Sequence, residues 1–351
     1  MKGKLFLFPY TNDSKLVLEN KDSIIGYSDI NILPLKEQSK EISGFLSPQE
    51  SLEDSEAIVL CDNISHLKLQ PYMKRLSEGI RKNKKVYLSP LMRKVLSKEF
   101  SEELGIIEKA TLLKEDWEFC QNEEDILFEI PVPVVCSLGL NENSDKFRLQ
   151  LELYKTFVKS GFRCSAILSN SLGKLMNFHV IPEFMYDDSI NLERKVLYFN
   201  NFVKDIVKRE QPDVILIGIP GAIMPMNKNI TNHFAEVALA IGMAVETDFS
   251  ILNINYVPTM NKEFIEELKL LAKYKLNMPV EMVAISNQRI LFNSESKELD
   301  TYFLSNSFVN EMHMTLDQDI PCPIFYMADK KNMSKNLHGV IKSLVENIDA
   351  V

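Results

Sequence analysis

Two long apolar runs, each leading into a turn and then a helical pattern, constrain the fold of this chain more than any other feature. The run VPVVCSLGL covers Val132 to Leu140, and DVILIGIPG covers Asp213 to Gly221. Central strands of a parallel sheet are buried on both faces and therefore read as near-continuous apolar runs. We predict a parallel-dominated sheet in which Val134–Leu138 and Val214–Ile219 are central neighbours.

Helical patterns separate these runs from further strands. Between Lys146 and Lys159 apolar residues recur at spacings of three and four, and Gly161 follows where a helix would end. A longer pattern runs from about Leu192 to Glu210, and a closing helix is predicted around Leu337 to Ile348. Strands are predicted in CSAILSN, FSILNINYV, EMVAISN and CPIFYMAD. This alternation predicts a doubly wound α/β fold.

The first part of the chain has the same wiring on a smaller scale. Short apolar runs lie in KLFLFPY, SIIGY, AIVLC and KVYLSP, with a helical pattern from about His66 to Lys82. An acidic segment punctuated by Pro131 and Pro133 follows. We predict a smaller N-terminal α/β domain at residues 1–125 and a P-loop-like α/β domain at residues 131–351.

Charge and cysteine usage exclude several classes of partner. The net charge of −9 repels a phosphate backbone, so no nucleic acid is expected. The five cysteines have no CxxC spacing, which predicts reduced thiols and neither a disulfide framework nor a zinc site. No apolar run approaches the length of a membrane span and no signal peptide is evident, so a cytoplasmic protein without a membrane partner is predicted.

The turn after the first apolar run is the leading candidate for a ligand site. In an open parallel sheet, ligands bind beyond the carboxyl ends of strands, where helix N-termini present N–H groups. Lys146 stands where a P-loop has its phosphate lysine, but Leu140 and Asp145 replace the two glycines and Phe147 replaces the magnesium-binding hydroxyl. The run at Asp213 ends without an acid at Gly218. We therefore predict weak or absent NTP hydrolysis.

Three turns should meet at this edge: Gly139–Lys146, Ser169–Ser171 and Gly218–Met224. An alternative role for Asp145 is to cap the following helix. No catalytic residue is assigned. The predicted ligand- or phosphate-binding residues are Gly139, Asn141, Glu142, Asn143, Ser144, Asp145, Lys146, Ser169, Gly218, Pro220 and Gly221.

Other groupings of polar residues favour structural roles. His179, Glu183 and Asp187 are spaced by four, but Pro182 would interrupt the helix that a shared metal site needs, so a surface loop and no metal are predicted. His233 is expected to open a helix capped by Thr231 and Asn232. No serine stands in a G-x-S-x-G elbow, which argues against a hydrolase triad.

The segments GLNENSDKF, FHVIPEFMYDD, PDVILIGIPGAIMPMN and MVAISN together resemble the clostridial peptide maturation system proteins, which occur beside radical SAM maturases of Cys-rich ribosomal peptides. The resemblance spans roughly Pro131 to Asp329 and implies a peptide substrate or a radical SAM maturase as partner. More distantly, the wiring is similar to dethiobiotin synthetase and MinD-like P-loop proteins, which implies a nucleotide-binding fold.

Three hypotheses for function follow. The first is a non-hydrolysing accessory protein of ribosomal peptide maturation that binds a peptide, a partner enzyme or an anionic small ligand. The second is a divergent enzyme that uses ATP or GTP as cofactor to activate a peptide or small molecule, with Lys146 on phosphates and Asp145 or Glu142 on a metal. The third is a dinucleotide- or S-adenosylmethionine-binding enzyme, but no G-x-G-x-x-G follows an N-terminal strand. The sequence favours the first.

Overall fold

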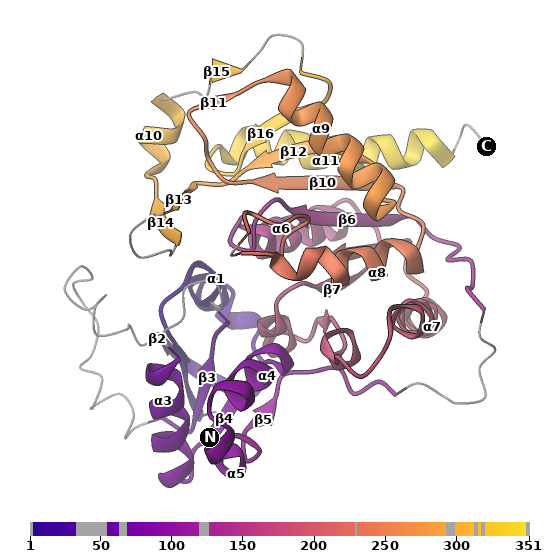
Figure 1. Ribbon diagram of the computed structural model, residues 1–351. Helices are drawn as coiled ribbons and strands as arrows, with labels where there is room; N and C mark the ends of the chain where they lie inside the picture. The colour runs from indigo at the N-terminus through magenta and orange to yellow at the C-terminus, as the bar shows by residue number, and fades with distance from the viewer. Residues whose placement is uncertain are drawn as a thin grey trace. The chain divides into compact units, whose positions relative to one another are not determined.

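A computed structural model of the chain describes residues 3–32, 55–62, 69–118, 126–228, 230–292, 299–311, 315–316 and 320–348. The described residues form two compact units, each an α/β layer structure (Figure 1). The smaller unit combines Met1–Glu115 with Asn170–Tyr186, and the larger combines Asp116–Ser169 with Asp187–Val351. A segment from the middle of the chain therefore belongs with the N-terminal part, a grouping that the continuous ranges predicted from the sequence do not contain.

The larger unit contains a parallel sheet whose strands run in the order β16-β12-β10-β6-β9-β7. The central strand β6 (Val134–Gly139) pairs in parallel with β9 (Val214–Gly218) on one side and β10 (Phe249–Ile254) on the other. All residues of these three strands are buried. The prediction that the two apolar runs are central neighbours is confirmed, because only a sheet covered on both faces buries such runs.

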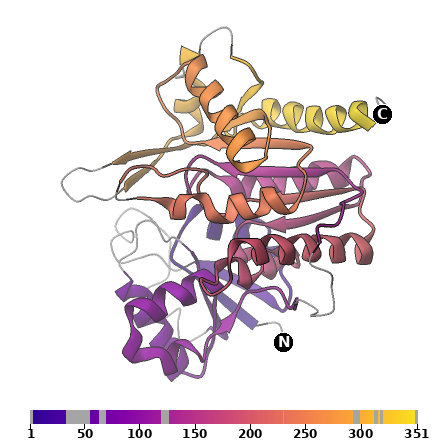
Figure 2. The same cartoon turned by 45° about the vertical axis from the view of Figure 1, so that its right-hand side comes forward.

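The outer strands of this sheet are β7 (Cys164–Leu168), β12 (Val280–Ile285) and β16 (Ile324–Tyr326). The helices are α6 (Lys146–Lys159), α7 (Leu192–Glu210), α8 (Glu236–Ala244), α9 (Lys262–Leu276) and α11 (Lys330–Ile348). They cover both faces, with α11 beside α6 on one face and α7, α8 and α9 on the other (Figures 1 and 2). The predicted doubly wound α/β fold with a mostly parallel sheet is thereby confirmed.

Beyond β12 the chain forms an antiparallel hairpin of β13 (Gln288–Phe292) and β14 (Leu299–Phe303), followed by α10 (Asn306–Glu311). A second small pairing joins β11 (Thr259–Met260) to β15 (Thr315–Leu316) in parallel. Both are additions to the doubly wound core.

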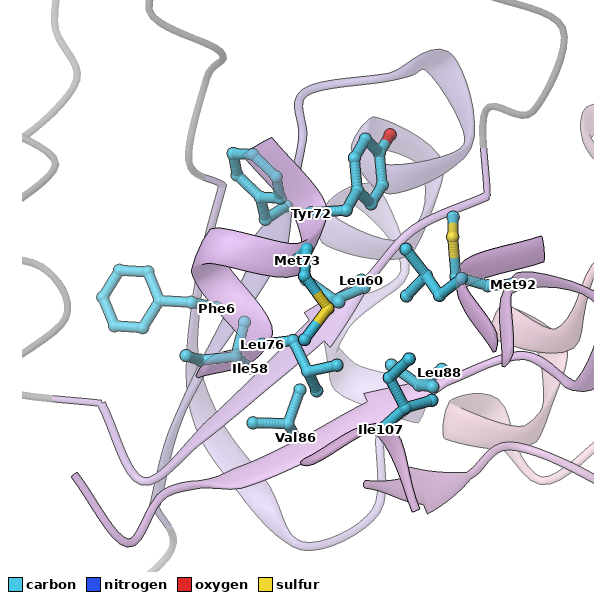
Figure 3. Packing of buried hydrophobic residues seen from close by; sticks show 12 residues of the cluster. Phe6, Ile58, Leu60, Tyr72, Met73, Leu76, Val86, Leu88, Met92 and Ile107 are labelled. Atoms are coloured by element: carbon cyan, nitrogen blue, oxygen red, sulfur yellow. The ribbon is translucent and has the colours of Figure 1, made fainter. Parts of the chain in front are cut away.

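The smaller unit has a parallel sheet of its own, in the order β2-β1-β3-β4-β5. Its strands are β1 (Gly3–Phe8), β2 (Tyr27–Ile32), β3 (Ala57–Leu60), β4 (Lys85–Leu88) and β5 (Thr111–Leu112). Its helices are α1 (Asn12–Glu19), α3 (Gln70–Arg81), α4 (Pro90–Glu99) and α5 (Leu104–Ile107). Figure 3 shows the core between this sheet and α3, where Leu76 and Ile107 pack against Ile58, Val86 and Leu88.

The inserted segment of the smaller unit carries η5 (Ser171–Met176), the two-residue strand β8 (His179–Val180) and η6 (Glu183–Tyr186). Charged residues tie it to the rest of that unit. Glu115 accepts hydrogen bonds from Lys174 at 3.1 Å and from the backbone N–H of Val180 at 2.8 Å, and lies 3.3 Å from His179 Nδ1. Glu183 contacts Arg93 and Lys114. Of the three residues considered as metal ligands, Glu183 therefore takes part in ion pairs and His179 contacts the Glu115 carboxylate.

Three local predictions are wrong, each for an identifiable reason. The strand predicted in SIIGY begins only at Tyr27, because Gly26 adopts a φ of 90° that a strand does not allow. The helix expected to open at His233 starts at Glu236, since Asn232 to Ala235 all have positive φ and form a separate turn. The closing helix begins at Lys330, earlier than predicted, because its first turns are polar.

Candidate functional site

The turn between β6 and α6 joins the centre of the larger sheet to the helix that covers it. Asp145, the residue before α6, adopts a left-handed conformation with φ of 58°. Its side chain makes no capping bond to α6 among the described residues and instead accepts a hydrogen bond from Gln288 Nε2 at 2.8 Å. The capping role considered for Asp145 is therefore wrong, because Gln288 at the start of β13 takes its carboxylate away from the helix.

Lys146 is the first residue of α6, and its side chain is almost fully buried, at 5% exposed. Its amine donates to the backbone carbonyl of Gly221, in the turn after β9. A Cβ atom at Gly139 would lie 2.6 Å from Lys146 Cδ and 2.6 Å from Ser144 Oγ. Glycine at position 139 is what allows the lysine to cross the end of β6 and reach the neighbouring turn.

Side-chain amides from the neighbouring strand hold the outer part of the turn. Asn255 Nδ2 donates to the carbonyl of Asn143 at 2.7 Å, and its Oδ1 accepts from Asn141 Nδ2 at 3.0 Å. Asn253 Nδ2 donates to the carbonyl of Ser144 at 3.1 Å. Two asparagines spaced by two at the end of β10 thus fix two consecutive carbonyls, and the turn keeps its shape without the glycines of a P-loop.

The predicted turns are brought together at the carboxyl edge of the sheet. Ile223 N–H donates to the carbonyl of Gly139 at 3.0 Å, which joins the turn after β9 to the end of β6. Ser169, after β7, bonds to Gln150 of α6, whose Oε1 accepts from the Ser169 N–H at 3.0 Å. Ser171 lies in η5 of the smaller unit. The ligand-binding role of these residues remains a prediction.

Gly218 stands where a P-loop protein carries the acid that orients magnesium. A Cβ there would lie 2.3 to 2.5 Å from the amide group of Gln150, so this amide fills the space that an acidic side chain would occupy. Phe147, at the position of the magnesium-binding hydroxyl, is buried. No cluster of three or more His, Cys, Asp or Glu side chains able to hold a metal occurs among the described residues.

Two buried polar atoms near the turn lack a protein partner among the described residues, namely Ser137 Oγ on β6 and Asn253 Oδ1 on β10. Buried polar atoms are nearly always hydrogen-bonded to protein, water or ligand. The two atoms come from β6 and β10, the paired strands that end at the candidate site.

Four residues of this site were missed from the sequence: Gln150, Asn253, Asn255 and Gln288. Gln150 lies one helical turn after Lys146. Asn253 and Asn255 are spaced by two at the end of β10, as residues on one side of an extended chain are, so their spacing is a signal that could have been used. Gln288 carries no local signal, because its partner Asp145 is 143 positions away in the chain.

No family model and no curated protein matches the sequence. The fold is similar to the crystal structure of a DUF1611 family protein from Anabaena variabilis, with a TM-score of 0.59 and 13% identity, over 98% of this chain and 99% of that one. This likeness shows the fold. A GTPase from Pyrococcus abyssi in its apo form (TM-score 0.30, 15% identity, 59% of this chain and 95% of that one) and chloroplast FtsY from Physcomitrella patens (0.29, 13%, 78% of each) match too weakly to support an argument.

Among the described residues, no helix combines the length and the apolar character that crossing a bilayer requires.

Proposed function

We propose that the larger unit binds an anionic group of a small ligand or peptide at the turn between β6 and α6, as an accessory protein of ribosomal peptide maturation, without efficient NTP hydrolysis. The observation that carries the proposal is the position of Lys146. Its buried side chain spans the carboxyl ends of β6 and β9 at the N-terminus of a 14-residue helix. A helix N-terminus and an ammonium group both favour negative charge.

The local chemistry favours anion binding over helix stability alone. Since the Asp145 carboxylate bonds to Gln288 and not to the first N–H groups of α6, it does not serve as the cap that would compete with an anion. An ammonium group carries three N–H donors and can bind several oxygens at once. Lys146 can therefore hold an anion while it contacts Gly221.

The same residues argue against phosphoryl transfer. Most of the catalysis in such enzymes is electrostatic stabilisation by magnesium held between the terminal phosphates. Here a buried phenyl ring and an amide occupy the two positions that would hold or orient that ion. Binding of a nucleotide would then proceed without efficient turnover.

The maturation role rests on the sequence resemblance of Pro131 to Asp329 to proteins found beside radical SAM maturases. Under this proposal the bound anion is a carboxylate of a precursor peptide, of the partner maturase or of a small ligand. The test is calorimetric titration with a synthetic Cys-rich precursor peptide of the kind that such maturases modify, with a scrambled peptide of the same composition as control. Equal binding of both peptides would contradict the maturation role.

Anion binding is tested separately, by thermal shift with pyrophosphate, ATP, GTP and S-adenosylmethionine, with and without magnesium. The variant Lys146→Met retains the alkyl chain over Gly139 but removes the charge, and Lys155→Met, a half-buried lysine of the same helix paired with Glu152, is the matched control. We expect stabilisation of the wild type and of Lys155→Met but not of Lys146→Met.

Absence of any anion-induced shift in the wild type would overturn the proposed site. Magnesium-dependent ATP or GTP turnover that Lys146→Met abolishes would instead establish the alternative function, a divergent nucleotide-dependent enzyme.

A further inference from the structure

The smaller unit has a topological switch point of its own, which is independent of the site described above. In the order β2-β1-β3-β4-β5, the chain leaves β1 toward β2 on one side and later returns to β3 on the other. In open α/β sheets, ligands bind beyond the carboxyl ends of the strands at such a reversal. Here these ends are Phe8 of β1 and Leu60 of β3.

Two carboxylates lie near these strand ends, and each accepts a hydrogen bond from a neutral side chain. Asp62 follows β3, and its Oδ1 accepts a hydrogen bond from Ser89 Oγ at 2.6 Å. Ser89 in turn accepts from the N–H of Met92 at 2.9 Å as the N-cap of α4. Asp13, in the first turn of α1 after β1, accepts from Asn170 Nδ2 at 2.6 Å. The carboxylates are thus fixed in position by the fold.

A buried hydroxyl without a partner completes the cluster. Tyr72 of α3 is fully buried, at 0% exposed, and its ring packs edge-on against Phe8 with centroids 5.4 Å apart. Its hydroxyl has no hydrogen-bond partner among the described residues. Figure 3 shows this hydroxyl pointing away from the other labelled side chains of the core. Buried hydroxyls are nearly always hydrogen-bonded to protein, water or a ligand, so the Tyr72 hydroxyl has its hydrogen-bonding capacity left for a bound group.

Backbone pairing and ring packing bring these elements together. The Cys61 N–H, next to Asp62, donates to the carbonyl of Phe8 at 2.7 Å, and Phe8 packs against Tyr72. The pKa directions agree with this arrangement. Burial raises the pKa of the Cys61 thiol well above its ordinary value, and the charges of Asp62 and Asp13 raise it further. Burial likewise raises the pKa of Tyr72, followed by the charges of Cys61 and Asp62. Both directions agree with Asp13 and Asp62 lying near Cys61, and with Cys61 and Asp62 lying near Tyr72.

The chemistry of the cluster selects the ligand. Two carboxylates accept hydrogen bonds only, and a tyrosine hydroxyl can also accept. Together they repel anions and attract a positively charged group rich in N–H donors. We propose that Asp13, Asp62 and Tyr72 form a binding site for the primary ammonium group of a small molecule at the β1/β3 switch point of the smaller unit. The three acceptor groups match the three N–H donors of such an ammonium group.

The experiment uses calorimetry and thermal shift on the full chain with matched probes. Ethanolamine carries the ammonium group, ethylene glycol replaces it with a neutral hydroxyl, and choline keeps the charge without N–H donors. Putrescine and methylammonium test longer and shorter amines. The variants are Asp62→Asn and Tyr72→Phe. Their controls are Asp213→Asn, an acid of the larger unit paired with Arg163, and Tyr87→Phe, a tyrosine of the same sheet whose hydroxyl pairs with Tyr27 at 3.0 Å.

We expect saturable binding of the primary amines and not of ethylene glycol or choline. Asp62→Asn and Tyr72→Phe should each weaken amine binding by on the order of tenfold or more, since each removes a hydrogen bond to a charged group. Without amine, Tyr72→Phe should not lower the thermal midpoint, because the hydroxyl it removes is unpaired in the protein. Both controls should bind like the wild type.

Three results would overturn the proposal. One is the absence of saturable binding of every amine at millimolar concentration. Another is equal binding of ethylene glycol or choline, which would show that charge or N–H donors do not matter. The third is unchanged amine affinity in Tyr72→Phe and Asp62→Asn.

Discussion

Asn255, the residue that follows β10, donates its side-chain amide to the backbone carbonyl of Asn143 at 2.7 Å, across 112 positions of the chain. Asn253 makes the equivalent bond to Ser144. The turn that carries Lys146 is therefore held by side chains at the end of a neighbouring strand, in addition to its own Gly139 and the bond from Ser144 Oγ to the Asn141 carbonyl. This explains how the turn can keep its shape with Leu140 and Asp145 at the two positions where a P-loop has glycine.

Replacing Asn255 with Ala should destabilise the fold around the candidate site. The change leaves the Asn143 carbonyl and the Asn141 amide without their partner, in a place where Asn255 itself is buried. An unsatisfied buried group costs about 1–3 kcal/mol, so the free energy of unfolding should fall by that amount in urea titrations. The control Asn336→Ala removes a hydrogen bond from a side-chain amide to the Asn332 carbonyl within α11. This variant should change the free energy of unfolding by less than about 0.5 kcal/mol. Equal effects of both variants would mean that the amide network does not shape the turn.

Gly218→Ala should be destabilising through a clash with Gln150. The added Cβ would lie 2.3 Å from Gln150 Oε1, and the amide can move only by giving up its bonds to Ser169. We expect a loss of roughly 1–3 kcal/mol of unfolding free energy.

The double variant Gly218→Ala with Gln150→Ala should recover part of that loss, because the clash partner is gone. Gly339→Ala in α11 is the control. It has open space around the new Cβ and should be neutral or stabilising by about 0.5–1 kcal/mol. Strictly additive single effects in the double variant would contradict this account of Gly218.

Glu115 should make the smaller unit sensitive to acid. Burial alone raises the pKa of Glu115, but hydrogen bonds from His179 and the Val180 N–H, with the charge of Lys174, outweigh it and lower the pKa below its ordinary value. A carboxyl whose pKa is lowered by folding stabilises the protein above its unfolded pKa. That contribution is lost as the pH falls through the lowered, folded pKa.

The variant Glu115→Gln should therefore be less stable at neutral pH and lose less stability on acidification than the wild type. Thermal midpoints measured from neutral pH down to the acid limit of folding provide the test. Glu152→Gln, which removes a partly exposed pair with Lys155, is the control and should keep the wild-type slope. An unchanged slope in Glu115→Gln would show that another group governs the acid response.

Thiol reactivity should be low in the folded protein. Burial raises the pKa of Cys136 to about 12 despite a hydrogen bond with Thr247, and burial alone raises that of Cys164 to about 12. Cys61, Cys136, Cys164 and Cys322 are free, while Cys120 lies outside the described residues. Since the thiolate is the reactive form, we expect slow labelling of these four described cysteines by iodoacetamide at neutral pH, followed by peptide mass mapping, and rapid labelling in denaturant. A stoichiometric internal bridge in non-reducing mass analysis would contradict the predicted reduced state.

The core of the larger unit could be predicted from the sequence because its signals are local and strong. The runs at Val134 and Val214 are apolar on both faces, and the period of α6 is unambiguous, so the pairing of β6 with β9 and the helix from Lys146 to Lys159 are confirmed. The start of a helix is harder to predict from the sequence when its first turns are polar. The first turns of α11 contribute Met333 to the core amid polar residues, and no apolar period marks them.

Long-range polar contacts could not be predicted. Glutamine and asparagine occur throughout the chain, and nothing in the local sequence of Gln288 indicates that it would bond to Asp145. The partners of Glu115 could not be predicted either. They are Lys174, His179 and Val180, which follow β6 and β7 of the larger unit in the chain. Periodicity identifies which face of an element is buried, but it does not identify the partner of a buried amide or carboxylate.

The membership of Asn170–Tyr186 in the smaller unit has a consequence for synthesis on the ribosome. Translation runs from the N-terminus, so the residues of β1 to β5 are synthesised before Lys174 and His179. During this interval Glu115 of the nascent smaller unit lacks these two partners. During that interval β6, α6 and β7 of the larger unit are already translated. Synthesis of the larger unit therefore begins before synthesis of the smaller unit is finished. A chain that ends before Tyr186 contains neither unit in full.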